Sequence, residues 1–378
     1  MRLTFWGVRG SVQAPDRQTW RYGGNTPCLL IRCGERSIII DAGTGIRELG
    51  HHLSGGGKAV EATLLLTHYH WDQIQGLPFF EPIYVPGNKL DIFGPTPQGE
   101  RSKTLKQAFG VLFGAPFFPV TASQLRCDCT LKEVKQADDF KVGSTRIRTC
   151  PVNHPQGALA YRLDDDTTSV MYAADHAPGN PELDGRLAKL AAGADVVICD
   201  VRCCLKEKGA KPAALGFGEL AMQSGVKSIF LCQHEAMGGD HDMDRAIRRV
   251  RLEFPATYAA TEAMTVDADS GGIRVSWRGA RLGQRIAMDI PVHVEVGAKE
   301  HRERNEARLQ DLSFYGAYLI SPHPFEAEEP IEILVPLQSE DGREVCLKGY
   351  VLRVEPHADR ALKDWHGIIV HFPAPPRE

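Results

Sequence analysis

Two histidines, His68 and His70, and an aspartate, Asp72, stand close together directly after the apolar run Ala62–Leu66. A single residue separates the two histidines, so at the end of a strand both rings can turn toward one cation, with the Asp72 carboxylate beside them. The apolar run is typical of a buried strand, which would fix the positions of these side chains. The types and spacing of these residues therefore predict a metal site.

Three further apolar runs also lead into residue types that can bind metal, and we interpret each run as a strand. A single histidine in such a place is more often an ordinary surface or core residue than a ligand. Four runs that all end in this way predict strands that present one edge to a shared metal site. The three runs and the residues that follow them are 146–151 with His154, 169–174 with Asp175, and 228–232 with Gln233 and His234.

At these residues the sequence resembles the metallo-β-lactamase superfamily, and in particular its phosphodiesterase-like hydrolase branch, over roughly residues 1–265. The resemblance implies an α/β fold, the αββα sandwich: two mixed β-sheets packed face to face, helices outside, and metal at one edge. The segments that carry the resemblance are Phe5–Ser11, Tyr22–Thr26, Ile40–Gly45 and Thr67–Phe80.

The family pattern is His-x-His-x-Asp-His, followed by a distant histidine, a bridging aspartate and a final histidine, which together hold two metal ions. Carried over to this chain, the resemblance implies that His68, His70 and His154 form the first metal site and that Asp175 bridges the two sites. Asp41 is expected to support a ligand through a hydrogen bond rather than to touch the metal.

The chain departs from the family in the second metal site. Asp72 matches the aspartate of the pattern, but Gln73 stands where the pattern has its next histidine. The position of the last histidine corresponds either to His234 or to Gln233. An amide oxygen is a much weaker zinc ligand than an imidazole nitrogen. Occupancy of the second site is therefore open.

Three hypotheses follow for the metal. One ion held by His68, His70, His154 and Asp175 suffices for ester hydrolysis by activating water. Alternatively, Asp72, Asp175 and His234 recruit a second ion, and the enzyme is a binuclear phosphodiesterase. In the third hypothesis the centre is inert. Zn²⁺ is the expected metal, with Mn²⁺ or Fe²⁺ as alternatives.

The resemblance also implies the chemistry. Asp72 is the expected catalytic residue, which would orient or deprotonate the attacking water. The expected substrate is a small-molecule phosphodiester or a related ester, while lactams and thioesters are not excluded.

Composition narrows the class of protein. The 378 residues are 43% hydrophobic, which is enough for two cores, and two domains are expected. The net charge of -4 gives no electrostatic basis for binding duplex nucleic acid. The N-terminus becomes polar too early for a signal peptide and no apolar run is long enough to cross a bilayer, so we expect a cytoplasmic protein without a membrane partner.

The pattern changes after residue 268, where Asp, Ser and Gly replace the alternation of helix and strand. We therefore predict a first domain at 1–268, a linker at 269–280 and a second domain at 281–378. The second domain shows short alternating strands separated by turns, which is typical of a small antiparallel β-barrel of six strands.

Two motifs in this second domain resemble the signatures of PilZ domains, RxxxR at residues 281–285 and DxSxxG at residues 311–316. PilZ domains typically bind cyclic di-GMP, so the resemblance implies a bacterial signalling protein. Guanidinium groups can grip phosphates and stack on guanine, and a carboxylate can accept hydrogen bonds from a guanine edge. The expected ligand-binding residues are Arg281, Arg285, Asp311, Ser313 and Gly316.

Taken together, these observations predict a metal-dependent hydrolase regulated by cyclic di-GMP. Because the two arginines lie where the domains join, we expect the dinucleotide to order that segment and to change access to the metal site. The alternative is a non-catalytic cyclic di-GMP effector with a degenerate metal site, which acts through a signalling protein partner. A third hypothesis is a mononuclear iron oxidoreductase, because the superfamily includes sulfur dioxygenases.

Overall fold

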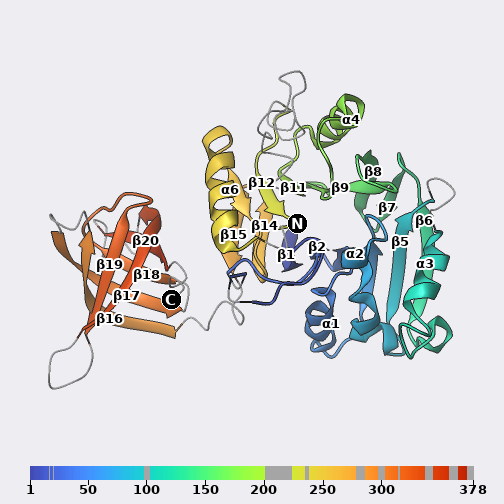
Figure 1. Ribbon diagram of the computed structural model, residues 1–378, viewed down its shortest axis with the longest axis horizontal. Coiled ribbons are helices and arrows are strands. Elements are labelled where there is room, and N and C mark those ends of the chain that lie inside the picture. Colours follow the sequence, from blue (N-terminus) through green and yellow to red (C-terminus); the bar gives the residue numbers. More distant parts are fainter. Residues whose placement is uncertain are drawn as a thin grey trace. The chain divides into compact units, whose positions relative to one another are not determined.

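The computed structural model divides into two compact units, Met1–Arg278 and Gly279–Glu378, each described by itself (Figure 1). The structure describes residues 1–16, 18–19, 21–97, 103–200, 224–234, 238–277, 286–296, 303–313, 316–336, 344–356 and 365–372.

The first unit is built on two mixed sheets. In spatial order the first sheet contains β15 (Gly272–Trp277), β14 (Met264–Asp269), β1 (Arg2–Gly7), β2 (Cys28–Cys33), β3 (Arg36–Ile40), β4 (Glu61–Leu65), β5 (Lys89–Pro95) and β6 (Asp128–Val134). The second contains β13 (Thr257–Ala259), β12 (Ile229–Cys232), β11 (Val196–Asp200), β10 (Ser169–Ala173), β9 (Ala158–Asp164), β8 (Thr145–Val152) and β7 (Asp139–Val142).

The apolar runs in the sequence become central strands because both faces of each sheet are covered. Every residue of β10 is buried, as are the last four residues of β4. Between the sheets lies one core, which includes Phe5, Tyr161 and Phe230, and each sheet has a further apolar cluster on its outer face. Strands covered on both faces need nearly continuous apolar sequence, which explains why these runs do not alternate.

Helices cover both outer faces. Residues of α1 (Ile46–Ser54) and α3 (Leu105–Leu112) belong to the cluster outside the first sheet, whereas residues of α4 (Pro181–Ala191) and α6 (Asp240–Glu253) belong to the cluster outside the second. The αββα sandwich predicted from the sequence is therefore confirmed. The remaining described helices are short: α2 (Trp71–Ile74), η1 (Leu77–Phe79), η2 (Glu81–Tyr84) and η3 (Ala122–Gln124). No helix in the described part of the chain has the length and apolar character needed to span a membrane.

The segment expected to be a linker contains a strand of the first sheet. Residues Gly272–Trp277 form β15, which pairs antiparallel with β14. The tight turn at residues 270–271 joins the two strands, and Asp269 accepts a hydrogen bond from the Gly271 amide. The Asp, Ser and Gly residues that suggested a linker are turn residues of a β-hairpin.

The second unit is a closed, six-stranded antiparallel barrel, as predicted. Its core contains buried residues such as Val294, Leu309, Ile333 and Ile368. In spatial order the strands are β16 (Ile286–Val296), β17 (Glu303–Ser313), β18 (Gly316–Ser321), β21 (His366–His371), β20 (Glu344–Pro356) and β19 (Pro330–Pro336).

Candidate metal centre

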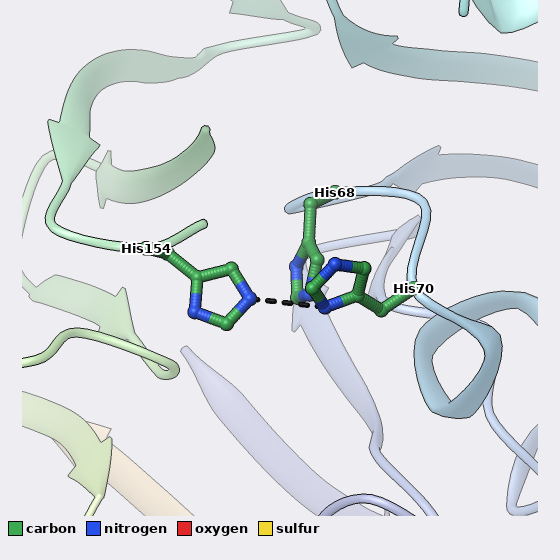
Figure 2. A group of neighbouring side chains, drawn as sticks. All are labelled: His68, His70 and His154. Carbon is green, nitrogen blue, oxygen red and sulfur yellow. Dashed lines mark hydrogen bonds between the residues drawn. The ribbon is translucent and has the colours of Figure 1, made fainter. Parts of the chain in front are cut away.

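Three histidines converge at one edge of the sandwich. His68 and His70 follow β4, and His70 stands directly before α2 in an extended conformation. His154 follows β8 and approaches from the second sheet, with its Nε2 3.0 Å from His70 Nδ1. The ring centroids lie 4.5, 4.6 and 4.8 Å apart, so the rings form a nearly equilateral group (Figure 2). The prediction that His68, His70 and His154 share one site thus agrees with their arrangement.

A hydrogen-bonded chain orients His68. Asp41 accepts hydrogen bonds from the Thr67 amide at 2.8 Å and from the Thr67 hydroxyl at 2.9 Å. The same hydroxyl lies 3.0 Å from His68 Nδ1. The Thr67 hydroxyl donates its hydrogen to Asp41 and can accept a hydrogen bond from His68 Nδ1–H. With the proton on Nδ1, His68 Nε2 keeps its lone pair, which points away from this chain of hydrogen bonds. Asp41 is thus linked through Thr67 to His68, one of the expected ligands.

Burial sets the charge state of these groups. Burial lowers the pKa of His68 well below its usual value, and the neighbouring His154 and His70 lower it further. His68 is therefore neutral near pH 7, the form that binds metal. Burial also raises the pKa of Asp41 to about 8, against the hydrogen bonds from Thr67, which lower it. A cation at the centre favours the ionised form of this carboxyl.

The three imidazoles fit a metal ion. His68 Nε2 is buried and has no hydrogen-bond partner among the described residues. The ligand atoms of the three histidines all lie within 4.8 Å of one another. Zinc–nitrogen bonds of about 2.0–2.1 Å in a tetrahedral arrangement place neighbouring nitrogens about 3.3 Å apart, close to the separation of the His70 and His154 nitrogens. Three neutral imidazole nitrogens are the donor set of many catalytic zinc sites.

Left-handed backbone conformations cluster at the same edge. Asp41 follows β3 with φ 61°, Asp175 follows β10 with φ 63°, and Gln233 follows β12 with φ 54°. This conformation costs a residue other than glycine about 1–2 kcal/mol. Strained backbone of this kind concentrates at functional sites, where the surrounding structure holds it in place.

Gln73 joins Asp72 and Asp175 in the half of the site where the family pattern has its second ion. Asp72 Oδ2 accepts from the Ser11 amide at 2.9 Å and from Gln73 Nε2 at 3.0 Å. Asp175 Oδ2 accepts from Gln73 Nε2 at 3.2 Å and from Gln233 Nε2 at 2.6 Å. The structure therefore brings Asp72 and Asp175 together, as predicted, but with the amide group of Gln73 between them.

The expectation that His234 is a metal ligand is not supported by the structure. Its Nε2 lies 2.8 Å from the Ala260 carbonyl oxygen, and its ring packs edge-on against Tyr22. Burial is the main reason that the pKa of His234 falls to about 3. Side chains of consecutive residues point in different directions at the end of a strand, so Gln233 faces the site and His234 packs in the interior.

Two residues near the site were not identified from the sequence. Asp200 ends β11 and accepts a hydrogen bond from the Asp175 amide at 3.1 Å. Thr67 carries the link between Asp41 and His68. Asp200 follows an apolar run just as Asp175 does, so the same rule applied to Val196–Cys199 would have found it.

A pocket of about 330 Å³ opens beside the histidines. Its lining is mostly apolar and includes one cationic side chain, Lys103, while Trp71 and Val111 remain partly open to solvent. Helix α3 supplies one wall, and a capping box at Thr104 and Gln107 fixes the start of that helix. The lining residues are His68, Tyr69, His70, Trp71, Ile74, Pro95, Thr96, Pro97, Lys103, Ala108, Val111, Leu112, Gln156 and Gly157.

In the barrel, the DxSxxG motif spans the end of β17 and the start of β18. Ser313, the last residue of β17, pairs with Gly316, the first of β18, and Asp311 lies two residues earlier. Arg281 and Arg285 lie outside the described residues. The backbone of β16 begins at the next residue, Ile286, which pairs with Leu312 between the aspartate and the serine of the motif.

Family comparison agrees with both units. The model of the Beta-lactamase superfamily domain matches residues 36–229, just over half of the chain, and the PilZ domain model matches residues 274–378. None of the curated proteins searched gives a match.

Two solved structures share the sandwich fold. The metallo-β-lactamase fold protein YhfI from Bacillus subtilis is 18% identical, with 70% of this chain and 97% of that chain covered and a TM-score of 0.52. Zn²⁺-bound PqqB from Methylobacterium extorquens is 12% identical and has a TM-score of 0.51, and the match covers 71% of this chain and 100% of that chain. At these identities the likeness shows the fold. The chain therefore belongs to the metallo-β-lactamase superfamily and carries a PilZ domain after its αββα sandwich.

Proposed function

We propose that this chain is a metal-dependent hydrolase of phosphodiester or related ester bonds, regulated by cyclic di-GMP that binds the PilZ domain. The main observation in favour is the convergence of three imidazoles, one with a buried unpaired Nε2, beside a pocket of about 330 Å³. Ligand-type nitrogens next to a cavity are the arrangement that a metallo-hydrolase requires.

The nitrogen donor set favours Zn²⁺ held by His68, His70 and His154. The solved structure of PqqB, which shares the fold, contains Zn²⁺. When bound, such an ion acts as a Lewis acid and lowers the pKa of water at the site. The hydrogen bond from His68 Nδ1 to Thr67 keeps the His68 ring fixed for this role.

Asp72 is the proposed catalytic base. Two donors, the Ser11 amide and the Gln73 amide group, hold its Oδ2 in place. That arrangement leaves Oδ1 to accept a proton from the attacking water. The carboxylate is largely buried, so its orientation does not depend on solvent.

The pocket suggests the kind of substrate. Apolar side chains from α2, from α3 and from the segment before α3 form much of the lining, and Lys103 adds a positive charge. An ammonium group in a mostly apolar pocket favours an anionic substrate with an apolar portion. A phosphodiester with a hydrophobic group meets both requirements.

The topology of the barrel supports cyclic di-GMP as its ligand. Ile286, the residue after the RxxxR motif, pairs with Leu312, which lies inside the DxSxxG motif. This pairing supports a joint role of the two motifs in binding one ligand. Arg281, Arg285, Asp311, Ser313 and Gly316 are the proposed binding residues.

The test is hydrolysis of bis(p-nitrophenyl) phosphate and p-nitrophenyl acetate by full-length protein before and after chelation, with and without cyclic di-GMP. We expect turnover that chelation removes, that Zn²⁺ restores and that the dinucleotide changes. Protein that binds the dinucleotide but holds no metal and has no turnover would instead be a signalling effector. Bound iron with consumption of O₂ would identify an oxidoreductase.

A further inference from the structure

Two glutamine side chains donate hydrogen bonds to the carboxylates of the second half of the site, and one of them, Gln73, links both carboxylates. Gln73 Nε2 donates to Asp72 Oδ2 at 3.0 Å and to Asp175 Oδ2 at 3.2 Å. Gln233 Nε2 donates to Asp175 Oδ2 at 2.6 Å. The four residues come from α2 and from the ends of β10 and β12, so three separate elements contribute to one network.

The network is buried, which makes its internal hydrogen bonds important. Gln73 is fully buried, Gln233 is 7% exposed and Asp72 is 8% exposed. Neighbouring carboxylates repel each other in such surroundings unless a cation or hydrogen-bond donors stabilise them. Here amide hydrogens do so, and the Ser11 amide adds another donor to Asp72.

The backbone around both glutamines fixes their positions. The Ala42 amide donates to the Gln73 carbonyl oxygen at 2.7 Å, and the Gln73 amide donates to the His70 carbonyl oxygen at 3.0 Å. On the other side, a Cβ at Gly10 would lie 2.9 Å from Gln233 Oε1 and 3.3 Å from the Gln233 carbonyl oxygen, so the backbone at Gly10 packs closely against Gln233.

A second zinc ion does not fit this arrangement. The amide nitrogens that face the carboxylates cannot bind a metal, because their lone pairs are delocalised into the carbonyl groups. Both amides would have to rotate, break three hydrogen bonds and offer only weakly binding oxygens. The Oε1 atoms of both glutamines are buried without a hydrogen-bond partner among the described residues. In the observed orientation, each glutamine side chain therefore acts on the carboxylates as a donor.

We propose that Gln73 and Gln233 replace the second metal ion of the family pattern, so that the centre binds a single ion and amide hydrogens hold Asp72 and Asp175 in its place. This inference rests on the proposed metal centre at His68, His70 and His154. It separates this chain from a binuclear phosphodiesterase. The proposed catalytic carboxylate, Asp72, is then positioned by the Gln73 side chain and the Ser11 backbone amide and not by a second cation.

The test is metal stoichiometry and needs no substrate. Metal-free full-length protein is saturated with Zn²⁺, desalted and analysed for zinc per chain, and the titration is repeated with Mn²⁺. We expect one equivalent of Zn²⁺ and no second equivalent of Mn²⁺. Two equivalents of either ion would overturn the inference and leave the proposed hydrolase intact, whereas no bound metal would overturn both.

A double variant, Gln73→His with Gln233→His, supplies the two missing imidazoles. We expect it to bind two equivalents of Zn²⁺, because nitrogen donors then stand beside Asp72 and Asp175. Gln136→His makes the same replacement in the turn between β6 and β7 and should still bind one equivalent. A folded double variant that binds one equivalent would contradict the role given to the glutamines. The wild-type stoichiometry decides the question if the double variant does not fold.

Discussion

At the scale of single residues, the site depends on groups that hold the ligands as much as on the ligands themselves. Thr67 is buried and is the one side chain that contacts both Asp41 and His68 in the described part of the chain. Its hydroxyl fixes which nitrogen of His68 carries the proton. Outer hydrogen bonds of this kind typically change metal affinity by about 10–100-fold.

Thr67→Val removes the hydroxyl but keeps the shape of the side chain. We expect the affinity for Zn²⁺ to fall about 10–100-fold, because His68 loses the partner that orients it. Competition with a chromogenic chelator measures this affinity. Thr63→Val makes the same change in β4 away from the site and should leave the affinity unchanged. Equal affinities in the two variants would show that the Asp41–Thr67–His68 chain has no role in metal binding.

His234 predicts a pH dependence of stability. Its pKa is about 3 in the folded protein, mainly through burial, whereas an unfolded histidine has a pKa of about 6.5. Between these values the unfolded state binds a proton that the folded state does not. Acid therefore favours unfolding. As the pH falls through this window, His234 lowers the free energy of unfolding by about 1.4 kcal/mol per pH unit.

His234→Gln keeps a donor for the Ala260 carbonyl but does not titrate. The free energy of unfolding of metal-free protein can be measured in urea between about pH 6 and 4. As the pH falls, it should decrease less steeply for this variant than for wild type, and the two slopes should differ by about 1.4 kcal/mol per pH unit. His51→Gln, at an exposed position on α1, should keep the wild-type slope. A wild-type slope in His234→Gln would contradict the assignment of this buried neutral histidine.

At the scale of elements, strand ends position the chemistry and α3 forms the pocket wall. The positions of β4, β8, β10 and β12 could be predicted because each is a continuous apolar run that ends in a polar residue. The sequence could not predict which of the two consecutive residues, Gln233 or His234, faces the site. The left-handed turn at Gln233 depends on packing around Gly10 and Val8, which the local sequence does not reveal.

Other elements are weakly indicated by the sequence for a related reason. Strand β17 is rich in charged and polar residues, and β15, which lies in the segment expected to be a linker, follows a turn rich in Asp, Ser and Gly. Both strands are held by pairing with their neighbours, β17 with β16 and β18, and β15 with β14. Cross-strand pairing overrides local composition, so sequence patterns alone indicate such strands weakly.

Val111→Trp tests the role of α3. Val111 lines the pocket and is 49% exposed, so a larger side chain can fill the cavity without disturbing the core. We expect kcat/KM to fall by about tenfold or more, with zinc content unchanged. Lys106→Trp adds the same side chain at an exposed α3 position outside the pocket lining and should have little effect. Equal kinetics in both variants would place the substrate elsewhere.

At the scale of the whole molecule, the chain combines a candidate metal centre with a PilZ domain. The proposed dinucleotide ligands Arg281 and Arg285 lie in the chain between β15 and β16, the last strand of the sandwich and the first of the barrel. A ligand that binds this segment therefore acts on the stretch of chain that connects the units. Regulation then requires that the dinucleotide bind two arrangements of the chain with different affinities.

Arg285→Ala tests this coupling. Loss of a charge-assisted, two-pronged contact should weaken cyclic di-GMP binding about 10–100-fold and remove the response of turnover to the dinucleotide. Calorimetry measures the binding and a chromogenic substrate measures the response. Arg274→Ala removes an exposed arginine of β15 that pairs with Asp269 and should retain both properties. If Arg285→Ala abolishes binding but leaves both basal and dinucleotide-dependent turnover unchanged, the PilZ domain does not control the hydrolase.

The most direct test of the central claim is the rate of phosphodiester hydrolysis per bound zinc ion in wild-type protein and in Asp72→Asn. The variant keeps the size of the side chain and the metal-binding histidines but lacks a carboxylate that can accept a proton. We predict equal zinc content and a rate lower by about 10²–10⁴-fold. Equal rates, or a wild-type rate that does not depend on zinc, would contradict a hydrolase in which Asp72 acts beside a metal held by His68, His70 and His154.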